Sequence, residues 1–181
     1  MKILYGIAKG KKLLIPKGAR PLSSSVKEAL FEKIKDKIKK SRFLDLFAGS
    51  GNVGIEALSR GAWKVTFVDK SSKAVKVIRE NLKNCGFLEF AEIIQSDAIS
   101  IIRTLHNRQC KFDIIFAGPP YKSNFAYEVL KEILNFPILD EDGILIIEHF
   151  KKYKLPEISG NLILKSKNIY GDTILSFYKW K

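Results

Sequence analysis

The chain has 181 residues, of which 46% are hydrophobic and 28% charged, a composition typical of one globular domain of ordinary size. No apolar run approaches the roughly 20 residues of a membrane span, and the amino terminus has no apolar core of signal-peptide length, so we expect a cytoplasmic protein without a membrane anchor. The cysteines and histidines form no cluster, which argues against a metal site. A monomer is the default expectation.

The net charge of +13 is large for this size and is concentrated at the amino terminus. Residues 1–27 hold seven basic side chains and no acidic one. Such a block suits the phosphates of a nucleic-acid backbone, although a solvated basic face is the alternative. We therefore expect residues 1–24 to form a basic arm of the same domain as residues 25–181. Its candidate RNA contacts include Lys9, Lys11, Lys12, Lys17 and Arg20.

Predicted helices and strands follow the arm in alternation. The segment 25–40 repeats apolar residues at helical spacing, and Ser25 with Glu28 forms a capping box. Short apolar runs predict strands at Leu44–Phe47, Val65–Val68, Glu92–Gln95, Phe112–Ala117 and Gly143–Glu148. Helical spacing predicts helices around Ile55–Leu58, Ala74–Leu82, Ile99–Leu105 and Tyr127–Leu134.

This alternation predicts an α/β protein with a parallel sheet that helices cover on both faces. The carboxyl-terminal segments Leu162–Lys167 and Ile174–Trp180 flank a turn at Tyr170–Thr173 and read as an antiparallel hairpin. The expected fold is a doubly wound, Rossmann-like three-layer α/β/α sandwich. Its sheet is expected to be mostly parallel and seven-stranded, with an antiparallel hairpin at the end. In such sheets, ligands bind at the carboxyl ends of the strands.

The turn after the first predicted strand reads DLFAGSGNVG and contains a formal G-x-G-x-x-G. With Asp69 after the next strand, these are also the parts of a dinucleotide site, so an NAD-dependent oxidoreductase is one candidate function. Asp45 favours a different cofactor, because its carboxylate would repel a pyrophosphate but attract the cationic amino and sulfonium groups of S-adenosylmethionine. Asp97, after the third strand, fits either an adenine contact or a helix N-cap.

The stretch FAGPPYKS ends the fourth predicted strand. Neither Pro119 nor Pro120 has an N–H to continue a strand, so the chain must turn there. A rigid proline carbonyl can accept a hydrogen bond from an exocyclic base amine and hold its nitrogen about 3 Å from a methyl donor. Tyr121 offers a ring on which an unstacked base can lie.

Taken together, these motifs resemble the RsmD family of bacterial 16S rRNA guanine-N2 methyltransferases over nearly the whole chain. LDLFAGSGNVGIEALSRGA is similar to the family's donor-binding signature, FDIIFAGPPY to its catalytic-strand motif and YGDTILSFY to its closing hairpin. KGKKLLIPKGARPLSSSVKEALF is similar to its amino-terminal segment. The resemblance implies a class I methyltransferase fold. It also implies methyl transfer from S-adenosylmethionine to the N2 amine of one guanine in 16S rRNA, within a small-subunit ribosomal particle.

The resemblance also implies site residues, when the family's functional residues are carried over to the matching positions of this sequence. Those expected around the methionine moiety are Asp45, Phe47, Gly49, Gly51 and Asn52. Asp69 and Lys70 are expected at the ribose, and Asp97 and Ala98 at the adenine. The catalytic corner would be Gly118, Pro119, Pro120 and Tyr121. Arg20, Pro21 and Ser23 would lie at the mouth of the site, between donor and RNA.

Gly118 departs from the family pattern, which has Asp or Asn there to accept a hydrogen bond from the target amine. Glycine has no side-chain oxygen, and the loss of one such hydrogen bond would slow the reaction about tenfold to over a hundredfold. We therefore expect one of three things: an enzyme that stays active through the Pro119 carbonyl and a water, a slow enzyme, or a non-catalytic RNA-binding or assembly protein that keeps the fold.

Overall fold

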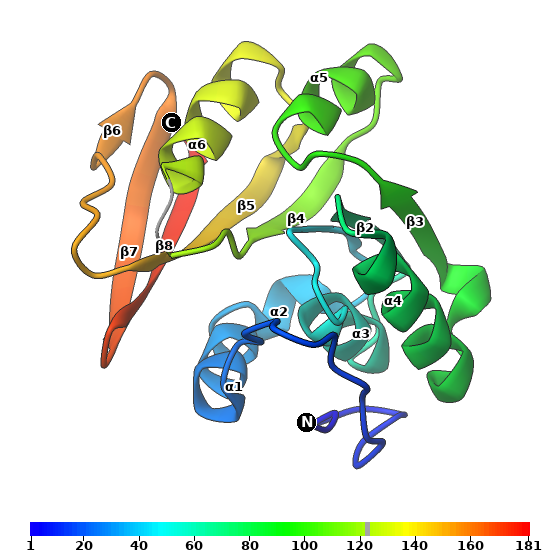
Figure 1. Ribbon diagram of the computed structural model, residues 1–181. Helices are drawn as coiled ribbons and strands as arrows, with labels where there is room; N and C mark the ends of the chain where they lie inside the picture. Colours follow the sequence, from blue (N-terminus) through cyan, green and yellow to red (C-terminus); the bar gives the residue numbers. More distant parts are fainter. Residues whose placement is uncertain (122–123) are drawn as a thin grey trace.

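A computed structural model describes residues 1–121 and 124–181, so Lys122 and Ser123 of the corner motif lie outside the described residues. The described part contains an eight-stranded sheet in the order β3-β2-β1-β4-β5-β8-β7-β6 (Figure 1). The strands are β1 (Arg42–Leu46), β2 (Lys64–Asp69), β3 (Ala91–Gln95), β4 (Phe112–Ala117), β5 (Leu139–Phe150), β6 (Ile158–Ser159), β7 (Leu162–Tyr170) and β8 (Thr173–Trp180). The helices are α1 (Ser24–Lys33), α2 (Lys35–Ile38), α3 (Asn52–Ser59), α4 (Ser72–Cys85), α5 (Ser100–Asn107) and α6 (Phe125–Asn135), with a 3-10 turn, η1, at Leu88–Phe90.

The sheet is covered on both faces, as predicted. Strands β1 to β5 run parallel, whereas β8 is antiparallel to β5 and β7 is antiparallel to β8. Side chains alternate along each strand, so Phe43 and Ile114 pack with α1–α4 while Leu44 and Ile115 pack with α5 and α6. Figure 1 shows α1–α4 on one side of the sheet and α5 and α6 on the other. The three-layer α/β/α sandwich with an antiparallel edge is confirmed.

The strand number and some strand bounds differ from the prediction. The sheet has eight strands instead of seven, because the two-residue β6 pairs with the start of β7. Two residues are too few to show an alternating pattern in the sequence. Strand β5 extends well beyond Gly143–Glu148 because it pairs with β4 on one side and with β8 on the other. The hairpin turn is tighter than expected, with Gly171 at φ 61° between β7 and β8.

The first helix also differs from its prediction. The N-cap is Ser23, whose Oγ accepts a hydrogen bond from the Val26 N–H at 3.4 Å, so the predicted capping box at Ser25 and Glu28 is wrong. The helical segment 25–40 is divided at Ile34, where the backbone leaves helical geometry (φ −111°, ψ 11°). None of the helices in the described ranges is long and apolar enough to cross a membrane.

The amino-terminal segment packs against α3 and α4. Ile3, Leu13 and Leu22 are buried in the same hydrophobic core as α1–α3. The Glu56 carboxylate of α3 accepts hydrogen bonds from the backbone N–H groups of the arm at Leu4 (2.8 Å) and at the next residue (3.0 Å). The basic arm is therefore attached to the domain along its length.

Lys27 belongs to the basic amino-terminal block in the sequence, but the structure buries it. Its side chain is fully buried, and its Nζ lies 2.9 Å from Glu56 Oε2. The ammonium also donates hydrogen bonds to Asn52 Oδ1 at 2.8 Å and to the Lys2 carbonyl at 3.1 Å. Lys27 thus stabilises the packing of the arm and α1 against α3, and it is not available to RNA.

Candidate functional site

A cavity of about 400 Å³ opens at the carboxyl ends of β1 and β4. Strand β1 pairs with β2 on one side and with β4 on the other. The chain therefore adds strands in one direction from β1 to β3 and in the opposite direction from β4 on, and ligands bind at such a switch point. The loops after β1, β2, β3 and β4 line the cavity, together with residues 18–22, the start of α6 and the end of β5. The predicted residues in its walls are Arg20, Pro21, Asp45, Phe47, Gly49, Asn52, Asp69, Lys70, Asp97, Ala98, Gly118, Pro119, Pro120 and Tyr121.

The glycine turn between β1 and α3 has three residues with positive φ: Phe47 at 60°, Gly49 at 57° and Gly51 at 74°. Gly49 lies in the cavity wall, but Gly51 does not, although it was predicted around the methionine moiety. A Cβ on Gly51 would lie 3.2–3.4 Å from core side chains, which include Ile55 and Phe67. Gly51 is therefore needed for the turn and the core, and the sequence pattern could not separate that role from ligand contact.

Asp45 places a buried carboxylate at the floor of the cavity. The residue is 1% exposed, and Oδ2 accepts a hydrogen bond from the Gly54 N–H at 2.9 Å. Burial raises the pKa of Asp45 to about 8, and the Gly54 hydrogen bond offsets part of that effect. Among the described residues no cationic side chain forms an ion pair with it. A cationic group in the cavity would therefore stabilise this carboxylate strongly.

The same hydrogen bond bears on the dinucleotide alternative. A pyrophosphate in a Rossmann fold binds at the N-terminus of the helix after the glycine turn. Here the Asp45 carboxylate accepts the Gly54 N–H in the first turn of α3. A phosphate at this helix end would lie beside a buried carboxyl group, so the geometry disfavours NAD and fits a ligand with a cationic group.

Asp69 and Asp97 hold the loops after β2 and β3. Asp69 accepts hydrogen bonds from the Gly49 N–H at 2.8 Å and the Ser71 N–H at 2.9 Å, one on each oxygen. Asp97 Oδ1 accepts from the N–H groups of Ile99 and Ser100, both at 3.0 Å, and so fixes the turn that leads into α5. Each Asp69 oxygen can accept a second hydrogen bond, and Asp97 Oδ2 accepts none of these bonds, so both residues keep the capacity to bind ligand hydroxyl or amino groups.

Asn52 lines the cavity and also joins three parts of the fold beneath it. It is 3% exposed, its Oδ1 accepts from Lys27 Nζ at 2.8 Å, and its Nδ2 donates to the Leu22 carbonyl at 3.4 Å. The side-chain amide therefore joins the arm, α1 and α3 beneath the cavity. Because the amide oxygen bonds to α1 and the amide nitrogen bonds to the arm, Asn52 holds this side of the cavity wall in place.

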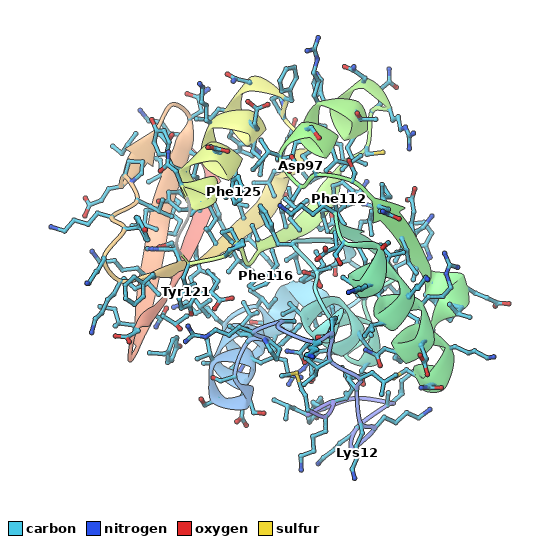
Figure 2. All side chains as sticks on the ribbon, viewed as in Figure 1. Lys12, Asp97, Phe112, Phe116, Tyr121 and Phe125 are labelled. Atoms are coloured by element: carbon cyan, nitrogen blue, oxygen red, sulfur yellow. The ribbon has the colours of Figure 1, made fainter. Side chains whose placement is uncertain are left out.

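The corner after β4 places the Tyr121 ring, labelled in Figure 2, beside a second acidic residue, Glu148. The Tyr121 hydroxyl donates to Glu148 Oε1 at 2.8 Å and also contacts the Thr173 hydroxyl. The Tyr121 ring stacks on Phe150 with centroids 5.7 Å apart, and the Arg20 guanidinium carbon lies 4.4 Å from its centroid. A base can stack on the ring face that Arg20 covers only after the guanidinium moves.

Phe125 and Glu148 are among the cavity residues that sequence reasoning missed. Phe125, labelled in Figure 2, stacks on Phe47 with centroids 5.6 Å apart and forms part of the cavity wall. No sequence pattern marked it. Glu148 could have been found, since it ends the predicted strand Gly143–Glu148 and so falls at the ligand-binding edge of the sheet.

The predicted RNA-binding residues divide into two groups. Lys9, Lys11, Lys12 and Lys17 are exposed and lie outside the cavity. Figure 2 shows Lys12 at the outer edge of the molecule, well away from Tyr121. Arg20 and Pro21 line the cavity and also an adjoining cleft of about 460 Å³, whose wall includes Ser23. No three His, Cys, Asp or Glu side chains gather as a metal site within the part of the chain that the structure describes.

Comparison with known proteins identifies the family of this chain. Residues 1–179 match the model described as Conserved hypothetical protein 95. YlbH of Bacillus subtilis is 38% identical over 181 residues, covering 99% of this chain and 98% of YlbH. Ribosomal RNA small subunit methyltransferase D of Haemophilus influenzae is 33% identical, covering 92% and 88%. The solved structure of YhhF from Escherichia coli superposes with a TM-score of 0.89 at 26% identity, covering 100% and 98%. The chain belongs to this family, the RsmD family of class I methyltransferases.

Proposed function

We propose that the protein transfers a methyl group from S-adenosylmethionine to the exocyclic N2 amine of a guanine in 16S rRNA of the small ribosomal subunit. The observation that carries this proposal is the buried Asp45 carboxylate at the carboxyl end of β1, in a chain whose relatives are named small-subunit rRNA methyltransferases. The strongly basic arm supports an RNA substrate.

The residues of the cavity fit S-adenosylmethionine by their chemistry. The Asp45 carboxylate would pair with the amino group of the methionine moiety. The acceptor positions of Asp69 suit the ribose hydroxyls, with Lys70 beside them, and Asp97 with Ala98 would border the adenine. When bound, the donor supplies an electrophilic methyl group. The corner at Gly118 to Tyr121 would hold the target amine in line with it.

The exposed lysines of the arm would bind the RNA backbone. Phosphate contacts of this kind position an RNA without reading its sequence and weaken as salt concentration rises. We therefore place Lys9, Lys11, Lys12 and Lys17 in the electrostatic part of the interface. Arg20, Pro21 and Ser23 lie nearer the cavity and would contact the RNA close to the modified guanine.

A label-transfer assay tests this function. Purified protein and S-adenosylmethionine with a radioactive methyl group are incubated with small-subunit particles, or with free 16S rRNA, from a strain that lacks the gene. We expect label in the 16S rRNA of the particles, of the free rRNA, or of both. Particles and rRNA from the wild-type strain should take up no label, because their guanine is already methylated. Binding of the RNA without any transfer of label would support the non-catalytic alternative and contradict the enzyme.

A further inference from the structure

The next strand of the sheet places a carboxylate beside Gly118. A Cβ built on Gly118 would lie 3.1 Å from Glu148 Oε2 and 3.1 Å from Phe116 Cε1. Strands β4 and β5 are parallel neighbours, with Ala117 opposite Ile147, so the residues that follow in each strand lie side by side. The Glu148 carboxylate thus occupies space that a side chain at position 118 would need.

The Glu148 carboxylate is held in a defined orientation. Its Oε1 accepts the hydrogen bond from the Tyr121 hydroxyl, whereas Oε2 has no hydrogen-bond partner within residues 1–121 and 124–181. The Tyr121 ring is in turn fixed between Phe150 and Arg20 and by its contact with the Thr173 hydroxyl. Oε2 is therefore a side-chain acceptor that a ligand at this corner can use.

Glu148 also lies at the junction of the cavity and the adjoining cleft. It lines both the 400 Å³ cavity that contains Asp45 and the adjoining 460 Å³ cleft toward the β7–β8 turn. The residues common to both are Arg20, Pro21, Leu22, Tyr121 and Glu148. Glu148 therefore lies in a wall that the cavity and the cleft share.

We propose that Glu148 is a catalytic residue that accepts a hydrogen bond from the target guanine amine and then takes its proton, in place of a side chain at position 118. This inference rests on the proposed methyl transfer. The amine nitrogen forms a bond to the methyl carbon as the carbon–sulfur bond breaks and its electron pair stays on sulfur. The proton released from the amine passes to Glu148 Oε2 and then to water.

The surroundings of Glu148 are consistent with a proton acceptor. Burial raises the pKa of Glu148, and the Tyr121 hydrogen bond and the positive charge of Arg20 offset part of that increase. A carboxylate with a raised pKa is a stronger base than an exposed one, yet it remains able to release the proton to water. Tyr121 acts through Glu148 and is a positioning residue.

Substitution of Glu148 tests the proposal directly. We expect Glu148→Gln to lower kcat for methylation of small-subunit particles by about 100-fold or more, because the amide cannot take the proton. The dissociation constant for S-adenosylhomocysteine, measured by calorimetry, should change less than about twofold, since Asp45 and Asp69 are intact. Glu141→Gln is the matched control, because it removes an exposed carboxylate from the same strand, and it should leave kcat unchanged.

Further variants distinguish Glu148 from a merely structural residue. Gly118→Asp should lower kcat, because the new carboxylate would crowd and repel Glu148 Oε2. The double variant Gly118→Asp with Glu148→Ala should be faster than Glu148→Ala alone, since it returns one carboxylate to the corner. Tyr121→Phe should lower kcat about tenfold with little change in donor binding, because it frees Glu148 to rotate.

The outcomes separate this inference from the proposed function. If the wild-type protein methylates 16S rRNA and Glu148→Gln is equally fast, the role of Glu148 is wrong and the function stands. The same conclusion follows if kcat falls only in proportion to a loss of folded protein or of S-adenosylhomocysteine binding. If the wild-type protein methylates no RNA, the proposed function fails, and the role of Glu148 fails with it.

Discussion

Glu56→Gln is expected to lower the free energy of unfolding by about 3–5 kcal/mol, because it leaves the fully buried Lys27 ammonium without its counter-charge. Burial already lowers the pKa of Lys27, and the Glu56 carboxylate opposes that effect. The carboxylate also accepts hydrogen bonds from the Leu4 N–H and from Arg60 Nε at 2.9 Å. The near-isosteric amide keeps the shape but has only one oxygen for these donors.

Chemical denaturation with urea measures this effect, and a surface ion pair provides the control. For a chain of this size, 3–5 kcal/mol corresponds to a fall in Tm of about 6–20 °C. Glu32→Gln removes one partner of the exposed Glu32–Lys35 pair, whose side chains are 68% and 59% exposed. It should cost at most about 1 kcal/mol. Equal effects of the two variants would mean that the buried pair does not anchor the arm.

Asp45→Asn is expected to weaken S-adenosylhomocysteine binding about 10- to 100-fold, the loss that follows removal of one hydrogen bond between charged groups. The pKa of Asp45 is about 8, so near neutral pH the carboxyl group must release a proton to pair with a cationic amino group. Between pH 6 and 7.5 the wild-type affinity should therefore rise with pH, whereas that of the variant should be nearly constant. Calorimetry over this range checks both expectations.

The same substitution should stabilise the folded protein. A folded-state pKa of about 8, above the ordinary value of 3.8, means that the stabilising contribution of Asp45 is present below about pH 4 and is lost as the pH rises through 8. Asn carries no charge and can still accept from the Gly54 N–H. Asp45→Asn should thus raise the free energy of unfolding by on the order of 3 kcal/mol at pH 8, with a smaller gain at pH 5. A variant that is less stable and binds the ligand as well as the wild type would contradict the role of Asp45.

The fold was predictable where one strong pattern decided the local structure. The strand Phe112–Ala117 was predicted with its observed bounds, because Pro119 and Pro120 follow a continuous apolar run and cannot extend it. The two-residue β6 and the break at Ile34 depend on tertiary pairing and backbone geometry, which leave no periodic signal. Element order and layers were therefore predictable, whereas some bounds were not.

The sequence predicted where most site residues lie better than it predicted what their side chains bind. The acids at the ends of β1, β2 and β3 line one cavity, as expected from parallel strands. The roles of Lys27 and Asn52 were not predictable. Lys27 belongs to a basic block in the sequence and Asn52 to a glycine turn, yet their side chains form a hydrogen bond with each other in the core. Burial is a property of the packed molecule, and charge counts along the chain do not reveal it.

The interpretation of Gly118 from the sequence differs from its interpretation in the structure. In the sequence, Gly118 removes the acceptor that the resemblance leads one to expect, which suggests a weakened enzyme. In the structure, the neighbouring strand places the Glu148 carboxylate against the same corner. The acceptor can thus come from β5, and the absence of a side chain at position 118 leaves room for it.

Nucleoside analysis of 16S rRNA by mass spectrometry tests the central claim most directly. The rRNA is taken from a strain that lacks the gene, from its parent and from the strain complemented with the wild-type gene or with Glu148→Gln. We predict that the deletion removes one N2-methylguanosine from the 16S rRNA and that the wild-type gene restores it, while the variant restores little. An unchanged N2-methylguanosine content, or the loss of a methyl group from a different base, would contradict the account.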